Sequence, residues 1–536
     1  MILGFMEALA RAPSIRVVVC KSELGAAFMA SGYAEGSDKP GVILTVGGPG
    51  ATNTFTGLCC ATAQGSPVVL VSGEVPSHVM GRRAAQDGSA LALDVTAMSR
   101  PATCVSASVG SVHDACTALD EAFRRAMHER AAAHVSVPLD IQRAAVDGTS
   151  ICRPRAARSD VATVGLAGVP RAAALVRAEG AKIALLVGRG GTEAGAEIQA
   201  LAELLGAPVA TTCGGKGIFP ERHALSLGVF SFGGGPLGRA ALTGGLDVLI
   251  AIGTGLGEFA SANYSDALIP NQALIHVDVD PSVFGRNYDC VPVCGDAKEV
   301  CRALIAELAG SRARPLPGWL IDLKARHARV AEPEMLTASS VPIRPERVMH
   351  ELEQALPSDA FVVADIGTSC LFVAHCLRLS PPQRSFIPMA WSCMGHPLGA
   401  SLGIRLGSGR PTLCVAGDAA FLSAGLELHT AVEQKVSEFV WLIISNGGHA
   451  LVRLGTTAIL GENHGVEDGK FAHSPRISAI AAALGAASVT VEQPNELQDA
   501  LGYAFSCGRP CVVDVRVDPK AMPPMADRIQ GLGTKV

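Results

Sequence analysis

The stretch that most constrains the fold is GDAAFLSAGLELHTAVEQKVSEFVWLIISNGG, over residues 417–448. It follows an apolar strand end and contains a Gly-Asp turn, an amphipathic helix, a second apolar strand and a Gly-Gly turn that opens with Asn446. This order predicts one strand–helix–strand unit. Because the strands of a parallel sheet end at the same edge, we expect Asp418 and Asn446 to lie side by side in the crevice where such sheets bind ligands.

The side chains at this edge carry oxygen ligands. A carboxylate, an amide oxygen and a backbone carbonyl beyond the Gly-Gly turn suit a hard cation such as Mg²⁺ that bridges to phosphates. An ordinary crossover with polar turns has the same spacing. Spacing alone therefore leaves both interpretations open.

Length and composition favour several α/β domains. A chain of 536 residues is too long for one hydrophobic core. Its residues are 49% apolar but only 4% aromatic, which fits parallel sheets covered by helices on both faces. No apolar run is long enough to span a bilayer, and a net charge of −5 without a basic stripe argues against nucleic acid. Small metabolites remain the expected partners, with no membrane and no nucleic acid.

The cysteines indicate the compartment. All sixteen are scattered, mostly in apolar runs, and none has the spacing of a zinc site. We interpret them as buried thiols in a reducing environment. The opening residues MILGFMEALARAPSIR lack the basic start of a signal peptide, so a cytoplasmic protein is expected.

Alternating strand and helix patterns predict an α/β fold of three doubly wound parallel-sheet domains. We place them at residues 1–145, 160–310 and 342–525, with Pro- and Arg-rich linkers over residues 143–160 and 312–345. The central domain includes a GRGG turn after a strand. Without the GxGxxG spacing, this turn is weak support for a dinucleotide.

The first domain opens with a predicted helix over residues 2–11 and a strand over residues 15–20. The helix ELGAAFMASGYAEG, a strand over residues 41–46 and the turn GGPGATN follow. Glu23 is the first polar residue of that helix. A Glu in a first turn is also favoured simply by the helix dipole.

The stretch over residues 417–448 resembles the thiamine diphosphate fingerprint of the acetolactate synthase-like superfamily, Gly-Asp-Gly followed by Asn-Asn. Here Ala419 replaces the third Gly and Ser445 the first Asn. In that family the ligands are the Asp, the second Asn and the backbone oxygen two residues later. The resemblance therefore implies thiamine diphosphate and Mg²⁺, with the metal on Asp418, Asn446 and Gly448 and cofactor contacts from Gly417, Ala419 and Ala420.

KSELGAAFMASGYAE and TVGGPGATN resemble the same family, in which a Glu begins a Gly-Ala-Ala helix and a Gly-Pro-Gly-Ala-Thr-Asn turn follows. On this resemblance Glu23 would face N1′ of the aminopyrimidine. Removal of water raises the pKa of a carboxyl group, so it can share a proton with the ring. Glu23 is therefore the expected catalytic acid.

Two further tracts carry cofactor candidates. AFVVADIGTSCLF ends a strand in a turn whose backbone and hydroxyls, at Gly367, Thr368 and Ser369, suit diphosphate oxygens, although helix caps use the same residues. In SFIPMAWSCMGHPLGASLG, Met394 aligns with the family methionine that bends the cofactor, and the carbonyl of Ser392 would accept from its 4′-amino group. The alternative for Met394 is a core methionine.

The substrate contacts are less specific. Gln86 matches a family glutamine that contacts cofactor or substrate, while Ala85 stands where the family has Phe and would enlarge the substrate pocket. Cys104 stands where acetolactate synthases have Lys. Further candidates, each of which also has a purely structural interpretation, are His78, Arg82, Arg83, His396, His449, Arg453, Asn463 and His464.

The resemblance implies a reaction class. We expect decarboxylation of a 2-oxo acid and transfer of the acyl anion equivalent to a carbonyl acceptor; a simple 2-oxo acid decarboxylase and a catalytically silent regulatory paralogue stay open. The resemblance leaves FAD possible but not favoured, because GTGLGEF replaces the charged run of the family's central domain. By this resemblance we expect an N-terminal domain without its usual first βα unit, unless the start of the sequence is misassigned. The family also implies a homodimer or homotetramer with active sites at the subunit interface.

Overall fold

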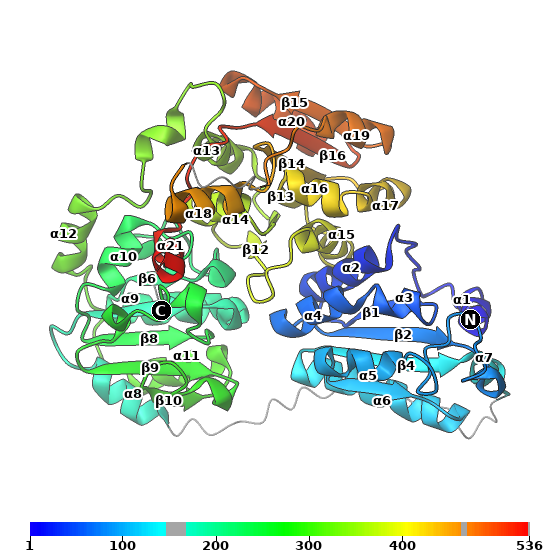
Figure 1. The fold of residues 1–536 in the computed structure, drawn as a ribbon. Coiled ribbons are helices and arrows are strands. Elements are labelled where there is room, and N and C mark those ends of the chain that lie inside the picture. The colour runs from blue at the N-terminus through cyan, green and yellow to red at the C-terminus, as the bar shows by residue number, and fades with distance from the viewer. Residues whose placement is uncertain (146–167, 463–468, 534–536) are drawn as a thin grey trace.

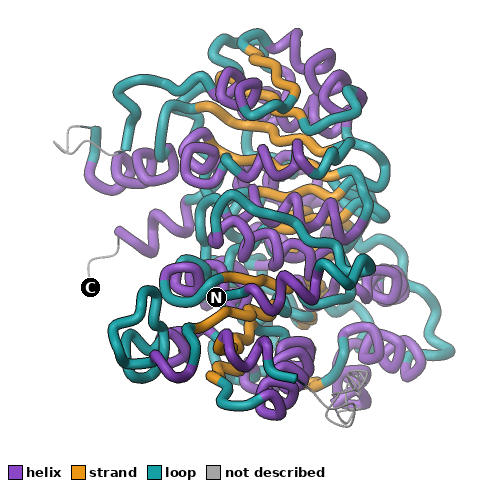
Figure 2. Tube along the Cα trace, turned by 90° about the vertical axis from the view of Figure 1, so that its right-hand side faces the viewer, coloured by secondary structure: helices purple, strands orange, loops and turns teal. Residues whose placement is uncertain are grey.

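Each third of the chain forms one parallel β-sheet (Figure 1). The computed structural model describes residues 1–145, 168–462 and 469–533. All strand pairs within the three sheets are parallel, and helices lie on both sides of the strands (Figure 2). The predicted α/β class with three parallel-sheet domains is thereby confirmed.

The N-terminal sheet has the strand order β1-β2-β4-β3. Its central strands β2 and β4 are buried along their whole length, as expected when helices cover both faces. The strands are β1 (Gly41–Thr45), β2 (Val68–Glu74), β3 (Val105–Ser108) and β4 (Ala132–Pro138), and the helices are α1 (Leu3–Leu9), α2 (Glu23–Gly36), α3 (Pro49–Thr52), α4 (Phe55–Gln64), α5 (Val95–Ser99), α6 (Val112–Glu129) and α7 (Leu139–Arg143).

The predicted strand over residues 15–20 is wrong. These residues pair with no strand, and Ile15, Val17 and Val19 are exposed. The physical reason is the missing neighbour, since an alternating apolar pattern forms a strand only where another strand offers its backbone. The segment instead lies against the C-terminal domain, where Arg16 donates to Gln434.

The central sheet has the order β10-β9-β8-β5-β6-β7. One predicted linker is in part a helix of this domain: α12 lies within residues 312–345 and buries Leu320 in the central core. The strands are β5 (Ile183–Val187), β6 (Val209–Thr211), β7 (Ser226–Val229), β8 (Val248–Ile252), β9 (Ala273–Asp278) and β10 (Val291–Cys294), and the helices are α8 (Val169–Val176), α9 (Gly195–Leu205), α10 (Pro236–Leu242), α11 (Ala297–Glu307) and α12 (Gly318–Arg326).

The C-terminal sheet has the order β12-β11-β13-β14-β16-β15, so the strand order reverses between β11 and β13. Its strands are β11 (Phe361–Ala364), β12 (Arg384–Phe386), β13 (Thr412–Gly417), β14 (Phe439–Ser445), β15 (Ala487–Val491) and β16 (Cys511–Arg516). Its helices are α13 (Pro345–Ala355), α14 (Thr368–Cys376), α15 (His396–Ser408), α16 (Asp418–Ala424), α17 (Glu427–Glu433), α18 (Ala450–Leu460), α19 (Ile477–Ala483), α20 (Leu497–Ser506) and α21 (Ala526–Gly533).

Helix α2 packs directly on α15, and this contact joins the N-terminal and C-terminal domains (Figure 1). Glycines make the close approach: a Cβ on Gly32 would overlap the carbonyl oxygen of Ala400, and one on Gly403 the carbonyl oxygen of Met29. The two helices therefore cannot keep this distance with larger residues at either position. Among the described residues, no helix is long and apolar enough to cross a membrane.

We expect Gly403→Ala to lower the free energy of unfolding by about 1–3 kcal/mol, because the new methyl group must push the α2 backbone away. Gly502→Ala is the matched control, since a Cβ there meets nothing within 4 Å and Gly502 also lies inside a helix, α20. The control is expected to be neutral or stabilising by up to about 1 kcal/mol. Urea unfolding followed by circular dichroism measures both. Equal effects of the two substitutions would contradict the close contact.

Candidate active site

The carboxyl ends of β11, β13 and β14 meet at one edge of the C-terminal sheet. Because β13 and β14 are parallel neighbours with Gly417 opposite Ile444, Asp418 and Asn446 follow directly at that edge. The backbone N–H of Gly447 donates to Oδ2 of Asp418 over 2.7 Å. The structure thus brings together the two residues that the strand–helix–strand pattern placed side by side.

Asp418 is a buried carboxylate, with 1% of its surface exposed. Burial raises its pKa, while backbone N–H groups of Gly447, Ala419 and Gly448 act in the opposite direction. A carboxylate that is held ionised out of water needs a cation or several hydrogen bonds as partner. Among the described residues, no three His, Cys, Asp or Glu side chains gather into a metal site. A cation at Asp418 would therefore need amide, hydroxyl or carbonyl oxygens among its protein ligands.

Asn446 offers such an oxygen. Its Nδ2 donates to Oγ1 of Thr368 over 3.2 Å, which fixes the orientation of the amide. Its Oδ1 is buried and has no hydrogen-bond partner. A buried acceptor without a partner is costly, so this atom is suited to a ligand. The orphaned oxygen next to a buried carboxylate fits a hard cation.

Gly448 lies beside these two residues, with φ of +141°. A Cβ at Gly448 would overlap the carbonyl oxygen of Gly469, so only glycine fits this turn. The carbonyl of Gly448 accepts from the N–H of Ala450 over 2.9 Å. A carbonyl oxygen has two lone pairs, so one remains for a metal.

The start of α14 adjoins Asn446 through Thr368. Gly367 precedes the helix with φ of +144°, and the Oγ of Ser369 donates to the carbonyl of Asp365 over 2.9 Å. The backbone N–H groups of this first turn face no preceding helical turn, so they are available to an anion. The other predicted contacts lie at the end of β13 and in the first turn of α16: Gly417 is half-buried, whereas Ala419 and Ala420 are buried.

The loop before α15 carries Met394, which is half-buried and packs against the C-terminal core. Ser392 in this loop has a left-handed backbone with φ of +54°, and its Oγ donates to the carbonyl of Met389. Gly395, the last residue before α15, donates its N–H to both carboxylate oxygens of Asp365 over 3.0 and 3.1 Å. The loop is therefore tied to the end of β11.

Asp365 is one functional candidate that sequence reasoning missed. It is fully buried directly after β11, and burial raises the pKa of its carboxyl group to about 8. Its position at the end of a strand is the signal, the same as for Asp418 at the end of β13. The pattern could not show that Gly395 is its partner.

Glu23 begins α2 and is half-buried. Its Oε2 accepts from Nδ2 of Asn53 in the GGPGATN turn over 3.2 Å, so the two N-terminal motifs meet. The first turns of α2 and α15 lie together, because a Cβ on Gly399 would contact Cβ of Phe28 and the carbonyl of Gly25. Glu23 and the loop that carries Met394 are thereby placed at neighbouring ends of two packed helices.

Glu427 is a second residue that sequence reasoning missed. It lies in α17, is buried, and accepts from the backbone N–H groups of Lys21 and Ser22, each over 3.0 Å. These are the two residues directly before Glu23. A carboxylate of the C-terminal domain therefore holds the start of the Glu23 helix, a contact that no sequence motif indicates.

The remaining candidates are less well placed. Gln86 is exposed, has φ of +63°, and lies against Gly48 of the GGPGATN turn. Arg453 donates to the carbonyl of Pro519 over 2.9 Å, and Cys104 packs against the N-terminal core. Asn463 and His464 lie outside the described residues. The others, all exposed, are His78, Arg82, Arg83, Ala85 and His449.

His396 is a packed residue rather than a polar group facing a substrate. It is 1% exposed, lies between the rings of Phe28 and Phe386, and shares a hydrogen bond of 3.2 Å with Oγ of Ser31. Burial lowers the pKa of His396 to about 4. The side chain therefore stays neutral at the interface of α2 and α15.

Acidification is expected to destabilise the protein through His396. The unfolded chain binds a proton with a pKa near 6.5 and the folded chain with one near 4, so the unfolded state gains protons first as the pH falls. Stability is then lost between these two values, by about 3 kcal/mol for this residue. His396→Leu should flatten the fall in stability between pH 7 and 4, measured by urea unfolding. The exposed His113→Leu serves as control, and equal slopes for both variants would refute the assignment.

The two loops after β5 and β8 touch each other in the central domain. The N–H of Gly190 donates to the carbonyl of Gly253 over 2.9 Å, and a Cβ on either glycine would overlap the other loop. This is the point where the strand order reverses and where α/β sheets bind nucleotides. The contact between the two loops does not by itself indicate a bound FAD, and we assign FAD no role.

Three family models match the sequence of this chain. These are the thiamine pyrophosphate enzyme N-terminal TPP-binding domain over residues 1–98, the central domain over residues 170–304 and the C-terminal TPP-binding domain over residues 365–515. The chain belongs to the thiamine pyrophosphate enzyme family.

Within this family the chain is similar to acetolactate synthases over nearly its whole length. It is 30% identical to the acetolactate synthase large subunit IlvB1 of Mycobacterium tuberculosis, covering 98% of this chain and 86% of that protein. It is also 30% identical to an acetolactate synthase of Arthrospira platensis, covering 95% of this chain and 88% of that protein. A protein named probable 2-ketoarginine decarboxylase AruI, from Pseudomonas aeruginosa, is 30% identical over 90% of this chain and 84% of its own length.

Proposed function

We propose that this protein uses thiamine diphosphate and Mg²⁺ to decarboxylate a 2-oxo acid and to transfer the acyl anion equivalent to a carbonyl acceptor. The observation that carries the proposal is the buried Asp418 carboxylate beside the orphaned Oδ1 of Asn446. Asn446 contacts Thr368 in the first turn of α14, where backbone N–H groups can take a diphosphate.

The metal would bind Asp418, Asn446 and the carbonyl of Gly448. Its charge would offset the buried carboxylate and the diphosphate together. The diphosphate would lie against the first turn of α14 and the turn after β13. The residues that line this part of the site are Gly367, Thr368, Ser369, Gly417, Ala419 and Ala420.

The other end of the cofactor would lie between the loop before α15 and the start of α2. Met394 would impose its bent shape, and the carbonyl of Ser392 would accept from the amino group. Glu23 would share a proton with the pyrimidine ring, and Gln86 would contact cofactor or substrate. Once bound, the cofactor supplies the carbanion stabilisation that no protein side chain offers.

Carboligation is favoured over simple decarboxylation by the similarity to acetolactate synthases over nearly the full length. The similarity to a protein named as a decarboxylase makes simple decarboxylation the second candidate. Both reactions begin with loss of carbon dioxide from a 2-oxo acid. They differ in whether the resulting carbanion equivalent is protonated or attacks a second carbonyl compound.

A screen of 2-oxo acids, each with and without an aldehyde or second oxo acid as acceptor, tests the proposal by mass spectrometry of the products. A hydroxyketone that appears only when donor and acceptor are both present is the expected result. An aldehyde as the sole product from every donor would establish the decarboxylase instead. Calorimetric titration with thiamine diphosphate and Mg²⁺ that detects no binding would favour the silent paralogue.

We also propose that the protein is a homodimer or homotetramer, as the family resemblance implies. Within the single chain described here, α2 packs on α15 of the same chain. The family resemblance implies that in the assembly Glu23 and the metal ligands of one active site come from different protomers. Light scattering coupled to size exclusion measures the assembly. A fully active monomer would contradict this part of the proposal.

A further inference from the structure

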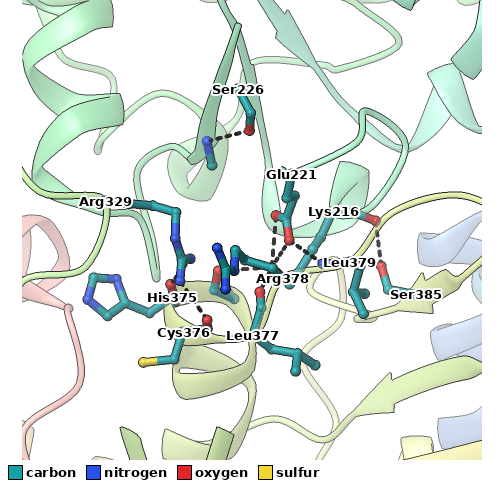
Figure 3. Close-up of polar contacts among 12 residues, drawn as sticks. Lys216, Glu221, Ser226, Arg329, His375, Cys376, Leu377, Arg378, Leu379 and Ser385 are labelled. Atoms are coloured by element: carbon teal, nitrogen blue, oxygen red, sulfur yellow. Dashed lines mark hydrogen bonds and ion pairs between the residues drawn. The ribbon is translucent and has the colours of Figure 1, made fainter. Parts of the chain in front are cut away.

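Helix α14 links the candidate cofactor site to the central domain. Its N-terminal end, at Gly367 and Thr368, is the proposed diphosphate site, and its last turn faces the central domain (Figure 3). The last carbonyl groups of any helix lack partners within that helix and carry the negative end of its dipole. The groups that bind these carbonyls therefore influence the position and the dipole of the whole helix.

Two cations from outside the C-terminal domain fill this position. Lys216 donates its Nζ to the carbonyls of Ala374 and Leu377 over 3.3 and 2.6 Å. Arg329 donates to the carbonyls of His375 and Cys376, each over 2.8 Å. Figure 3 shows both side chains pointing at the end of the helix. Four consecutive carbonyls at the end of α14 thus accept from charged donors.

Lys216 is an unusual residue for this position. It comes from the loop after β6, and its side chain is completely buried. Its Nζ also donates to both carboxylate oxygens of Glu221 over 2.9 Å, and Glu221 accepts from the backbone N–H of Leu379 over 2.7 Å. A buried ion pair is seldom retained for stability alone, because the cost of removing water offsets the attraction between the charges.

The second cation lies in the segment between the two domains. Arg329 follows α12 and is half-buried. Beside it, Nε2 of His375 accepts from the backbone N–H of Ala331 over 2.8 Å, so the segment also contacts α14 through a side chain. The central domain and the segment after it therefore both form hydrogen bonds with the same end of α14.

We propose that Lys216 and Arg329 are positioning residues for the diphosphate, acting through α14. By binding its last four carbonyls they fix the helix along its axis and offset the negative end of its dipole. The first turn then keeps its N–H groups aimed at an anion. This inference rests on the proposed function, and it gives the central domain a part in cofactor binding although that domain supplies none of the proposed cofactor contacts.

The test is calorimetry of two probes, Mg²⁺-thiamine diphosphate and Mg²⁺-pyrophosphate, with the full-length chain. The variants are Arg329→Met and the double substitution of Lys216→Met with Glu221→Gln, which removes the buried charges together. We expect each variant to lose affinity for both probes by about threefold to thirtyfold, the range of helix-dipole effects. Both probes carry the diphosphate, so both should weaken by a similar factor.

Arg222→Met is the matched control. Arg222 lies next to Glu221 and pairs with Glu353, but the structure records no bond from it to α14. The affinities of the Arg222→Met variant for both probes are expected to stay within twofold of those of the wild type. If Arg329→Met and the double variant also stay within twofold, or if only thiamine diphosphate weakens, the inference is wrong. Should the double variant fail to fold by circular dichroism, Arg329→Met alone decides.

The outcomes for the inference and for the proposed function are distinct. No binding of thiamine diphosphate by the wild type would remove the proposed function. If the wild type binds thiamine diphosphate and the variants bind it with unchanged affinity, only the proposed role of Lys216 and Arg329 is refuted.

Discussion

Asp418→Asn is expected to abolish Mg²⁺-dependent binding of thiamine diphosphate, with an affinity loss of about a thousandfold. The substitution keeps the shape and one oxygen but removes the buried negative charge that holds the metal. The metal contribution to such a site amounts to several kcal/mol, which sets the size of the effect. Calorimetric titration of the cofactor at fixed Mg²⁺ measures the affinity directly, without substrate.

Asp278→Asn is the matched control for this substitution. Asp278 ends β9 of the central sheet, as Asp418 directly follows β13 of the C-terminal sheet, and accepts from the N–H of Asp280 over 3.0 Å. Its substitution is expected to leave cofactor affinity unchanged. Retention of Mg²⁺-dependent binding by Asp418→Asn would show that the metal lies elsewhere.

Glu23→Gln is expected to lower kcat by about a hundredfold to ten-thousandfold, the usual range for loss of a general acid or base. Affinity for the cofactor should change little, because Glu23 lies at the opposite end of the site from the metal ligands. Steady-state kinetics measures kcat, and NMR of deuterium exchange at C2 of the bound cofactor measures proton transfer without any substrate. Both rates should fall together.

Glu35→Gln provides the comparison on the same helix. Glu35 is near the end of α2 and pairs with Arg189, so its substitution should lower stability but leave kcat within about threefold. If Glu23→Gln behaves like Glu35→Gln in both assays, Glu23 is not the catalytic acid.

The strand–helix–strand pattern was sufficient to place Asp418 beside Asn446. Parallel strands end at one edge, so a local pattern fixes a spatial neighbour. Gly448 came from the family resemblance instead, and the first turn of α14 from the Gly-Thr-Ser turn that follows a separate strand. The pattern of strands and helices also gave the fold class, because buried apolar strands alternating with helices leave few other arrangements.

Contacts between domains were beyond the sequence. Neither Glu427 beside Ser22 nor Lys216 at the end of α14 follows from any local period, since each pair joins distant parts of the chain. The strand predicted over residues 15–20 was wrong for a related reason. Its apolar alternation is real, but a strand also needs a neighbour that the pattern cannot supply.

Two helices that follow one another in the chain serve opposite ends of the candidate site. Helix α16 begins with the proposed metal ligand Asp418, and α17 begins with Glu427, which fixes the backbone ahead of Glu23. The connection between the two helices is short. We therefore expect the protein without the metal to hold Glu23 in a less ordered position as well.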